Sequence, residues 1–342
     1  MSSLRSQFAE WGLKFPAFSR YLATYFFFKN YPPPKIPLHK RNEDLDIISE
    51  RFYKYNLLSS EMVLWADFHA LFRDLDQISI DTLKKVYVNQ LYCAKHNYIP
   101  DDIWLGEDYE NKIKVTMSLV EARYRGISLP PYIELKEDID FYNCGLFFVP
   151  AIVLIFKHTM DILDCGAYVG DSTLVFEKFY NPRRIYAFEP MKENYQKLLQ
   201  TISFMGLKKV IPVQRGITDK KSIAKINLCG VASYLEENPE TYHTIETTDI
   251  DSFCEENFVE PGIIKMDIEG CELSAIRGAL NTIKKYKPIL LISIYHTPED
   301  FFEIKPLLER ELPDYMFMVR KLVTYHPVFE TSLICYPKPG DN

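Results

Sequence analysis

The sequence predicts a doubly wound α/β domain, with a mostly parallel seven-stranded sheet and helices on both faces, preceded by a mainly α-helical N-terminal domain. From about Met160 onward, short apolar runs alternate with segments of helical period, which is typical of strand–helix–strand units. The length of 342 residues favours two domains, because a single core usually stops growing at about 250–300 residues.

The C-terminal half supplies one apolar run for each expected strand and an amphipathic segment for each expected helix. Strands are predicted over 161–165, 184–189, 209–214, 262–267, 288–294, 314–319 and 331–336. Helices are predicted over 171–180, 191–205, 249–257, 271–285 and 298–310. The stretch 222–247 is expected to add strands or a loop over the active site.

The N-terminal half has a helical pattern but carries no recognisable chemical motif. Helices are expected to begin at Ser60–Glu61 and at Asp81 and to span 111–124, after a first helical segment (1–30) and a proline-rich linker (31–37). An extended segment or hairpin is predicted over 133–146, with a short apolar helix over 149–157. The expected units are therefore a helical domain (1–130) for substrate recognition or homo-oligomerisation, a connecting segment (131–160) and the α/β domain (161–342).

Composition argues against several classes of function. The net charge of -7 disfavours nucleic acid as a partner. The seven cysteines are scattered without a CxxC pair, so neither a zinc site nor a dithiol motif is indicated, and reduced thiols in the cytoplasm are expected. The longest apolar run, 146–156, includes Pro150 and is shorter than the roughly 20 residues of a transmembrane helix. The N-terminus lacks the apolar core of a signal peptide, which also favours a cytoplasmic protein.

The first predicted strand leads into a glycine-containing loop, DCGAYVGDS (residues 164–172). Gly166 would let a ligand approach the backbone closely, and Gly170 would permit a tight entry into a helix capped by Asp171 or Ser172. The spacing differs from the GxGxxG that binds the pyrophosphate of NAD. Acidic residues on both sides of the loop would repel a diphosphate, but they suit the ammonium and sulfonium of S-adenosylmethionine. The alternative is a tight turn with only a structural role.

Carboxylates follow two further predicted strands. Glu189 ends the second strand, where such a residue accepts hydrogen bonds from ribose hydroxyls. Asp267 and Glu269 emerge after the buried strand 262–267, where they could orient the methionine ammonium, hold an acceptor or take its proton. The alternative for Glu189 is an exposed strand-end glutamate, and for Glu272 it is a residue that only complements a helix dipole.

Four segments in this order resemble the FkbM family of methyltransferases: DILDCGAYVGDSTLVF, IYAFEPMKENYQKLL, IKMDIEGCELSAIRGA and KPILLISIYH. The resemblance covers about 160–336 and implies a Rossmann-like methyltransferase fold. It also implies S-adenosylmethionine as cofactor, S-adenosylhomocysteine as product, and O-methylation of a sugar or natural-product hydroxyl, as in glycan biosynthesis. Cys165 and Tyr168 depart from the family pattern, which leaves contacts at Tyr168 open.

Carried over by position, the resemblance places Asp164, Gly166 and Gly170 around the methionine part of the cofactor, Glu189 at the ribose and Asp219 near the adenine. Asp267 and Glu269 match the family's element beside the transferred methyl group. With their loop neighbours, the expected cofactor-binding residues are Asp164, Gly166, Ala167, Tyr168, Gly170, Asp171, Ser172, Glu189, Asp219 and Asp267.

Three residues are candidates for the general base: Glu269, Asp267 and His296, which follows the fifth predicted strand. No spacing typical of metal ligands is visible, so Mg²⁺ is not assigned. Two other functions remain open: methylation of a nitrogen or carboxylate on a protein or small metabolite, and a non-catalytic module that binds S-adenosylmethionine. Residues 267–270 lack the Asn/Asp-Pro-Pro-Tyr/Phe motif of many nitrogen methyltransferases, which argues against nitrogen as acceptor.

Overall fold

The computed structural model describes residues 51, 52, 55, 61–96, 109–150, 156, 157, 159–229, 232–234, 242–324 and 328–338. The expected N-terminal helix (1–30) and linker (31–37) lie outside these residues, as does most of the expected apolar helix over 149–157.

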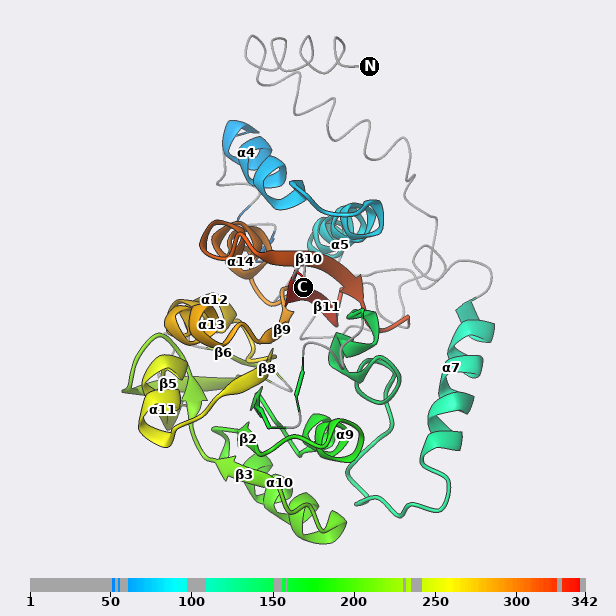
Figure 1. Ribbon diagram of the computed structural model, residues 1–342. Helices are drawn as coiled ribbons and strands as arrows, with labels where there is room; N and C mark the ends of the chain where they lie inside the picture. The colour runs from blue at the N-terminus through cyan, green and yellow to red at the C-terminus, as the bar shows by residue number, and fades with distance from the viewer. Residues whose placement is uncertain are drawn as a thin grey trace.

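A seven-stranded sheet forms the centre of the described chain, in the order β10-β11-β9-β8-β1-β2-β3 (Figure 1). Strand β11 is antiparallel to both of its neighbours, and the other pairs are parallel. The predicted fold is confirmed, and each observed strand overlaps its predicted range: β1 (Asp161–Cys165), β2 (Ile185–Phe188), β3 (Val210–Val213), β8 (Pro261–Met266), β9 (Ile289–Ser293), β10 (Tyr315–Lys321) and β11 (Thr331–Pro337).

Helices cover both faces of this sheet because successive strand residues point to opposite sides. Ile263 packs toward α9 (Asp171–Tyr180), and its neighbour Ile264 belongs to the core on the other face. Helix α10 (Lys192–Met205) lies on the face of α9, and the opposite face carries α11 (Ile250–Asn257), α12 (Glu272–Arg277), α13 (Leu280–Tyr286) and α14 (Pro298–Glu311) (Figure 1).

The single helix predicted over 271–285 is instead two helices, α12 and α13. The interruption falls at Gly278, which packs directly against the backbone of Thr218. A Cβ atom there would lie 2.7 Å from the Thr218 carbonyl oxygen, so the close approach requires glycine.

The part of the sequence between β3 and α11 forms a second sheet of four strands, in the order β4-β7-β5-β6. Its strands are β4 (Gly216–Ile217), β5 (Ser222–Cys229), β6 (Ala232–Tyr234) and β7 (Tyr242–Thr248). The prediction of additional strands over 222–247 is therefore confirmed.

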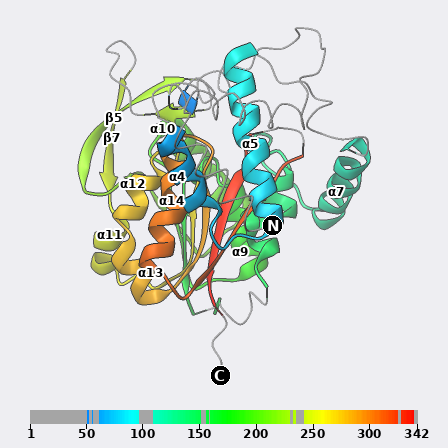
Figure 2. The ribbon, with the colours of Figure 1, turned by 90° about the horizontal axis from the view of Figure 1, so that it is seen from above.

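The N-terminal helix α4 (Glu61–Phe72) packs against α14, as Figure 2 shows, and α5 (Gln77–His96) packs against β10 (Figure 1). Their residues Leu71, Leu83 and Val86 share one hydrophobic core with the sheet and α14. The prediction that the second helix begins at Asp81 is wrong. It begins at Gln77, because Asp76 Oδ1 accepts the N–H of Ser79 at 2.7 Å and caps the first turn.

Helix α7 (Tyr109–Arg123) matches the third predicted helix, but the extended segment predicted over 133–146 is wrong. The chain forms two short helical turns there, η1 (Glu137–Phe141) and η2 (Asn143–Phe148). Acidic side chains of this segment accept backbone N–H groups, one nearby and one distant in the sequence, and such bonds compete with strand pairing. Asp140 Oδ2 accepts the N–H of Lys136 at 2.7 Å, and Glu137 Oε2 accepts the N–H of Thr324 at 2.9 Å.

Among the described residues, no helix combines the length and the apolar character needed to cross a bilayer.

Candidate active site

A cavity of about 280 Å³ opens at the carboxyl ends of β1, β2, β8 and β9. In open α/β sheets this edge binds ligands, at the point where the strand order reverses. Here the order reverses at β1, which lies between β8 and β2. The cavity wall is built by the loops after these strands, by the segment around η1, by β4 and β7, and by the ends of β10 and β11.

The loop after β1 brings backbone to the cavity wall. Gly166 has a φ of +80°, and a Cβ atom there would lie 1.9 Å from the carbonyl oxygen of Asp267. The N–H groups of Gly166 and Ala167 both donate to the Phe188 carbonyl, at 3.0 and 2.8 Å. Only glycine fits at position 166 without displacing the loop after β8.

Asp164 lies beneath this loop and is fully buried, and its Oδ1 accepts no hydrogen bond from the described residues. Its Oδ2 accepts hydrogen bonds from Ser172 Oγ at 2.8 Å and Thr173 Oγ1 at 2.5 Å. The register of β1 and β8 places Lys265 beside it, with Nζ 3.5 Å from Asp164 Oδ1 and 2.7 Å from the Gly166 carbonyl oxygen. Burial lowers the pKa of Lys265, but Asp164 and nearby acids outweigh burial and hold it above its usual value. This buried pair fixes the shape of the loop.

Glu189 follows β2, is 5% exposed and lines the cavity. Its Oε1 accepts the N–H of Met191 at 2.8 Å, and its Oε2 accepts the N–H of Tyr168 at 3.1 Å. Burial raises the pKa of Glu189 to about 7, although these hydrogen bonds act in the opposite direction. A carboxylate oxygen has a second lone pair, so each oxygen can still accept a bond from a ligand hydroxyl.

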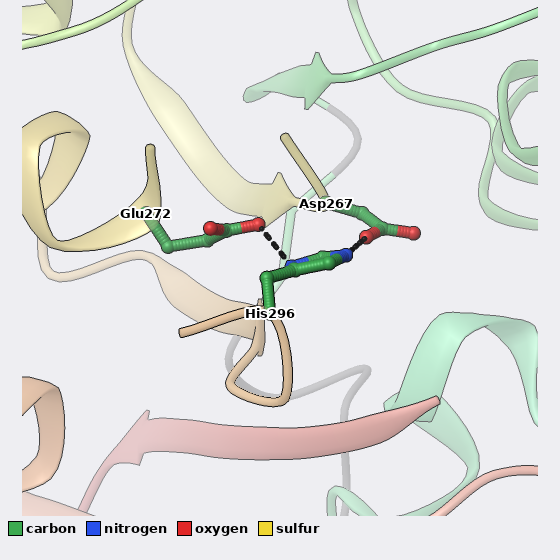
Figure 3. A group of neighbouring side chains, drawn as sticks. All are labelled: Asp267, Glu272 and His296. Carbon is green, nitrogen blue, oxygen red and sulfur yellow. Dashed lines mark ion pairs between the residues drawn. The ribbon is translucent and has the colours of Figure 1, made fainter. Parts of the chain in front are cut away.

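Side chains from the loops after β8 and β9 meet around His296 (Figure 3). Glu272 Oε1 lies 3.0 Å from His296 Nδ1, and Nε2 lies 3.5 Å from Asp267 Oδ1 and 3.4 Å from Glu269 Oε2. The fully buried Glu272 also accepts the N–H groups of Ile268 and Gly270, both at 2.8 Å. Glu272 therefore fixes both the imidazole and the loop that carries Asp267 and Glu269.

The charges around His296 determine its protonation. Burial lowers the pKa of His296, but the carboxylates of Glu272, Glu269 and Asp267 outweigh burial and hold it well above its usual value. The three carboxylates therefore favour the doubly protonated, positively charged imidazole, which lies between them at the cavity wall.

Asp267, Glu272 and His296 each offer one metal-ligating atom, and these atoms lie within 4.8 Å of one another. Imidazole binds a metal through the in-plane lone pair of one ring nitrogen. In Figure 3 the ring lies between the carboxylates, with Glu272 at Nδ1 and Asp267 at Nε2. Because the two acids lie at different ring nitrogens, this arrangement disfavours one ion shared by all three residues.

Residues 164–319 match the family model for the Methyltransferase FkbM domain. These residues form an FkbM methyltransferase domain. Among solved structures, the methyltransferase FkbM from Methylobacillus flagellatus KT shares 22% sequence identity with the chain, with a TM-score of 0.54. The alignment covers 80% of this chain and 58% of that protein, so this chain spans little more than half of its length.

Two further solved structures align with lower TM-scores. An rRNA methylase from Streptococcus thermophilus has 8% identity and a TM-score of 0.37, over 60% of this chain and 100% of that one. M. jannaschii TYW2, in complex with AdoMet, has 15% identity and a TM-score of 0.30, and the alignment covers 60% of this chain and 77% of that one. No curated protein sequence matches the chain at a significant level.

Within the FkbM domain, the structure brings most of the predicted site residues to one cavity. Its wall includes Gly166, Tyr168, Asp171, Glu189, Asp267, Glu269 and His296. Four other predicted residues lie behind this wall and support it: Asp164, Ala167, Gly170 and Ser172. Asp219 is exposed and lies outside the lining residues, although its neighbour Thr218 is one of them.

Sequence reasoning missed two residues that shape the FkbM domain's site. Lys265 lies within an otherwise apolar strand, between Ile264 and Met266. A single lysine in such a strand was the sequence signal that could have indicated a buried charged pair. For Glu272 the sequence leaves a helix-dipole role open as one alternative, but its carboxylate lies 3.0 Å from His296 Nδ1. No sequence signal identified that contact, because it joins the loops after two different strands.

Proposed function

We propose that this chain is an S-adenosylmethionine-dependent methyltransferase that methylates a hydroxyl oxygen of a sugar or glycan. One observation carries the proposal. The Gly166 loop, the Glu189 carboxylate and the group of Asp267, Glu269 and His296 line the same cavity of an FkbM domain. A nucleoside-binding wall and a group of acid–base residues thus face one space.

The cofactor would lie across the ends of β1 and β2. Glu189 would accept hydrogen bonds from the ribose hydroxyls, as strand-end carboxylates do in related nucleotide sites. Gly166 would allow the cofactor to lie against bare backbone. The acidic lining, which includes Asp171 and Asp267, suits a ligand with a sulfonium and an ammonium and disfavours a diphosphate.

Methyl transfer is an in-line displacement at the sulfonium carbon, so the protein contributes mainly by holding the acceptor oxygen in line with the methyl group. As the new bond forms, the hydroxyl becomes a strong acid, and a carboxylate is basic enough to take its proton. We assign this step to Glu269, whose side chain is 32% exposed at the cavity. The protonated His296, held by Glu272, would orient the Glu269 and Asp267 carboxylates.

The test is transfer of a labelled methyl group from S-adenosylmethionine to a panel of nucleotide sugars, lipid-linked sugars and polysaccharide fragments. Wild type is expected to label an oxygen of at least one of these acceptors. Glu269→Gln is expected to lower the rate by about 10²–10⁴-fold, the usual contribution of general acid–base catalysis. The matched control is Glu255→Gln, which changes an exposed glutamate of α11.

Cofactor binding separates the possible failures. Binding of S-adenosylhomocysteine by Glu269→Gln should equal that of wild type, because Glu269 acts on the acceptor. Labelling only of a nitrogen or a carboxylate within these acceptors would contradict the hydroxyl assignment. Cofactor binding without transfer to any acceptor would favour a non-catalytic module, and a fully active Glu269→Gln would eliminate Glu269 as the base in favour of Asp267.

A further inference from the structure

The segment before β1 places an opposite pair of charges in the cavity wall. Lys136 and Asp138 both line the cavity, next to the Gly166 loop and Asp171. Lys136 Nζ lies 3.5 Å from Asp171 Oδ2, which anchors the segment to the start of α9. Both residues precede the range that matches the FkbM family, so the family match assigns them no role.

Asp138 is a buried acid, and one of its carboxylate oxygens lacks a hydrogen bond from the described part of the chain. It is 6% exposed, and its Oδ1 has no hydrogen-bond partner among the described residues. Burial raises the pKa of Asp138 to about 7, although nearby Lys136 acts in the opposite direction. Leaving a carboxylate oxygen buried and unpaired is costly, so such a group usually has a ligand or another partner.

The loop acid that the sequence suggested for the methionine end of the cofactor does not line the cavity. Asp164 accepts hydrogen bonds from Ser172 and Thr173, faces Lys265, and lies behind the cavity wall. A ligand ammonium at the Gly166 loop therefore needs a different carboxylate.

We propose that Asp138 and Lys136 bind the amino-acid end of S-adenosylmethionine: Asp138 accepts a hydrogen bond from its ammonium, and Lys136 pairs with its carboxylate. This inference rests on the proposed function and deepens it. With the ribose at Glu189 and the methyl group beside Asp267 and Glu269, the methionine chain is left to run along the wall formed by Gly166, Asp171 and η1. That wall presents the two opposite charges that a zwitterion requires.

The test compares two ligands by calorimetry on the full chain. S-adenosylhomocysteine carries the amino-acid end, and 5′-methylthioadenosine keeps the adenine, ribose and thioether but lacks that end. Asp138→Asn is expected to weaken S-adenosylhomocysteine by about 10- to 100-fold, the range for loss of a charge-assisted hydrogen bond. It should change the affinity for 5′-methylthioadenosine by less than about threefold.

Two further variants provide an independent test and a control. Lys136→Met should also weaken S-adenosylhomocysteine selectively, and it provides an independent test if Asp138→Asn does not fold. Glu134→Gln is the matched control, because Glu134 is an exposed acid of the same segment and lies outside the cavity lining. It should leave both affinities unchanged.

The pattern of losses decides the outcome. Equal weakening of both ligands by Asp138→Asn and Lys136→Met, or no weakening of S-adenosylhomocysteine by either, would overturn the assignment while leaving the proposed cofactor intact. Failure of wild type to bind either ligand would refute the cofactor itself, and this assignment with it.

Discussion

Replacing Gly166 with alanine tests how the loop after β1 fits against the loop after β8. The new Cβ would lie 1.9 Å from the Asp267 carbonyl oxygen, which is far inside van der Waals contact. The two loops would have to separate, although they are joined by the hydrogen bond from the Asp267 N–H to the Cys165 carbonyl at 3.1 Å. The variant therefore combines a backbone cost with an overpacking cost.

The two costs can be measured separately. Alanine in a left-handed conformation costs about 1–2 kcal/mol, and overpacking a tight site costs about 1–3 kcal/mol. Gly166→Ala should therefore lower the free energy of unfolding by about 2–5 kcal/mol. Gly126 is a matched control, because its φ of +79° nearly equals the +80° of Gly166, but no described atom lies within 4 Å of its Cβ position.

The assay is chemical denaturation followed by far-ultraviolet circular dichroism for wild type and both variants. Gly126→Ala should lose only the backbone cost, about 1–2 kcal/mol. The difference between the variants then reports the clash with Asp267. Gly166→Ala should also lose affinity for S-adenosylhomocysteine, because the displaced loops form the cavity wall, whereas Gly126→Ala should not. Equal destabilisation by the two variants would refute the reasoning.

Three other predictions follow from buried acids of the site. The pKa of Glu189 is raised to about 7 by burial, and ribose hydroxyls bind its charged form. Affinity for 5′-methylthioadenosine, which has the ribose but not the amino-acid end assigned to Asp138, should therefore fall as the pH drops below about 7 in wild type when measured by calorimetry, and a Glu189→Gln variant with the same fall would contradict this. Glu272→Gln should slow methyl transfer at least tenfold through His296 while changing S-adenosylhomocysteine affinity less than threefold; an unchanged rate would show that Glu272 has no positioning role. Asp164→Asn should destabilise the fold by about 3–5 kcal/mol in denaturation experiments, because it leaves the buried Lys265 unpaired. Adding Lys265→Met should restore part of that loss, and further loss in the double variant would exclude an unpaired charge as the cause.

Local patterns in the sequence were sufficient to predict the sheet. Each central strand is an apolar run buried on both faces, so the runs themselves mark the strands, and helix α9 was predicted with its observed bounds. The loop glycines and the strand-end carboxylates Glu189, Asp267 and Glu269 could also be predicted, because the carboxyl ends of parallel strands meet at one edge. The cavity contains these three acids.

Predictions of secondary structure from local patterns failed where side-chain hydrogen bonds to the backbone set the local conformation. Residues 137–140 were predicted to lie in an extended segment, but Asp140 bonds to the nearby backbone of Lys136, Glu137 bonds to Thr324, and the chain forms η1 instead. The start of α5 was misplaced by four residues because Asp76, and not Asp81, caps it. These outcomes depend on individual hydrogen bonds, which hydrophobic periodicity does not encode.

The sequence by itself determined the order of strands and helices and the residue types at the strand ends, because hydrophobic periodicity and loop chemistry are local properties. Only the tertiary structure decided which charges meet. The register of β1 and β8 pairs Asp164 with Lys265, the junction of two loops places Glu272 on His296, and the packing of η1 brings Asp138 to the cavity. Each of these contacts joins residues from different elements, and the energy of a charge depends on its burial and its neighbours, which are set by the folded chain.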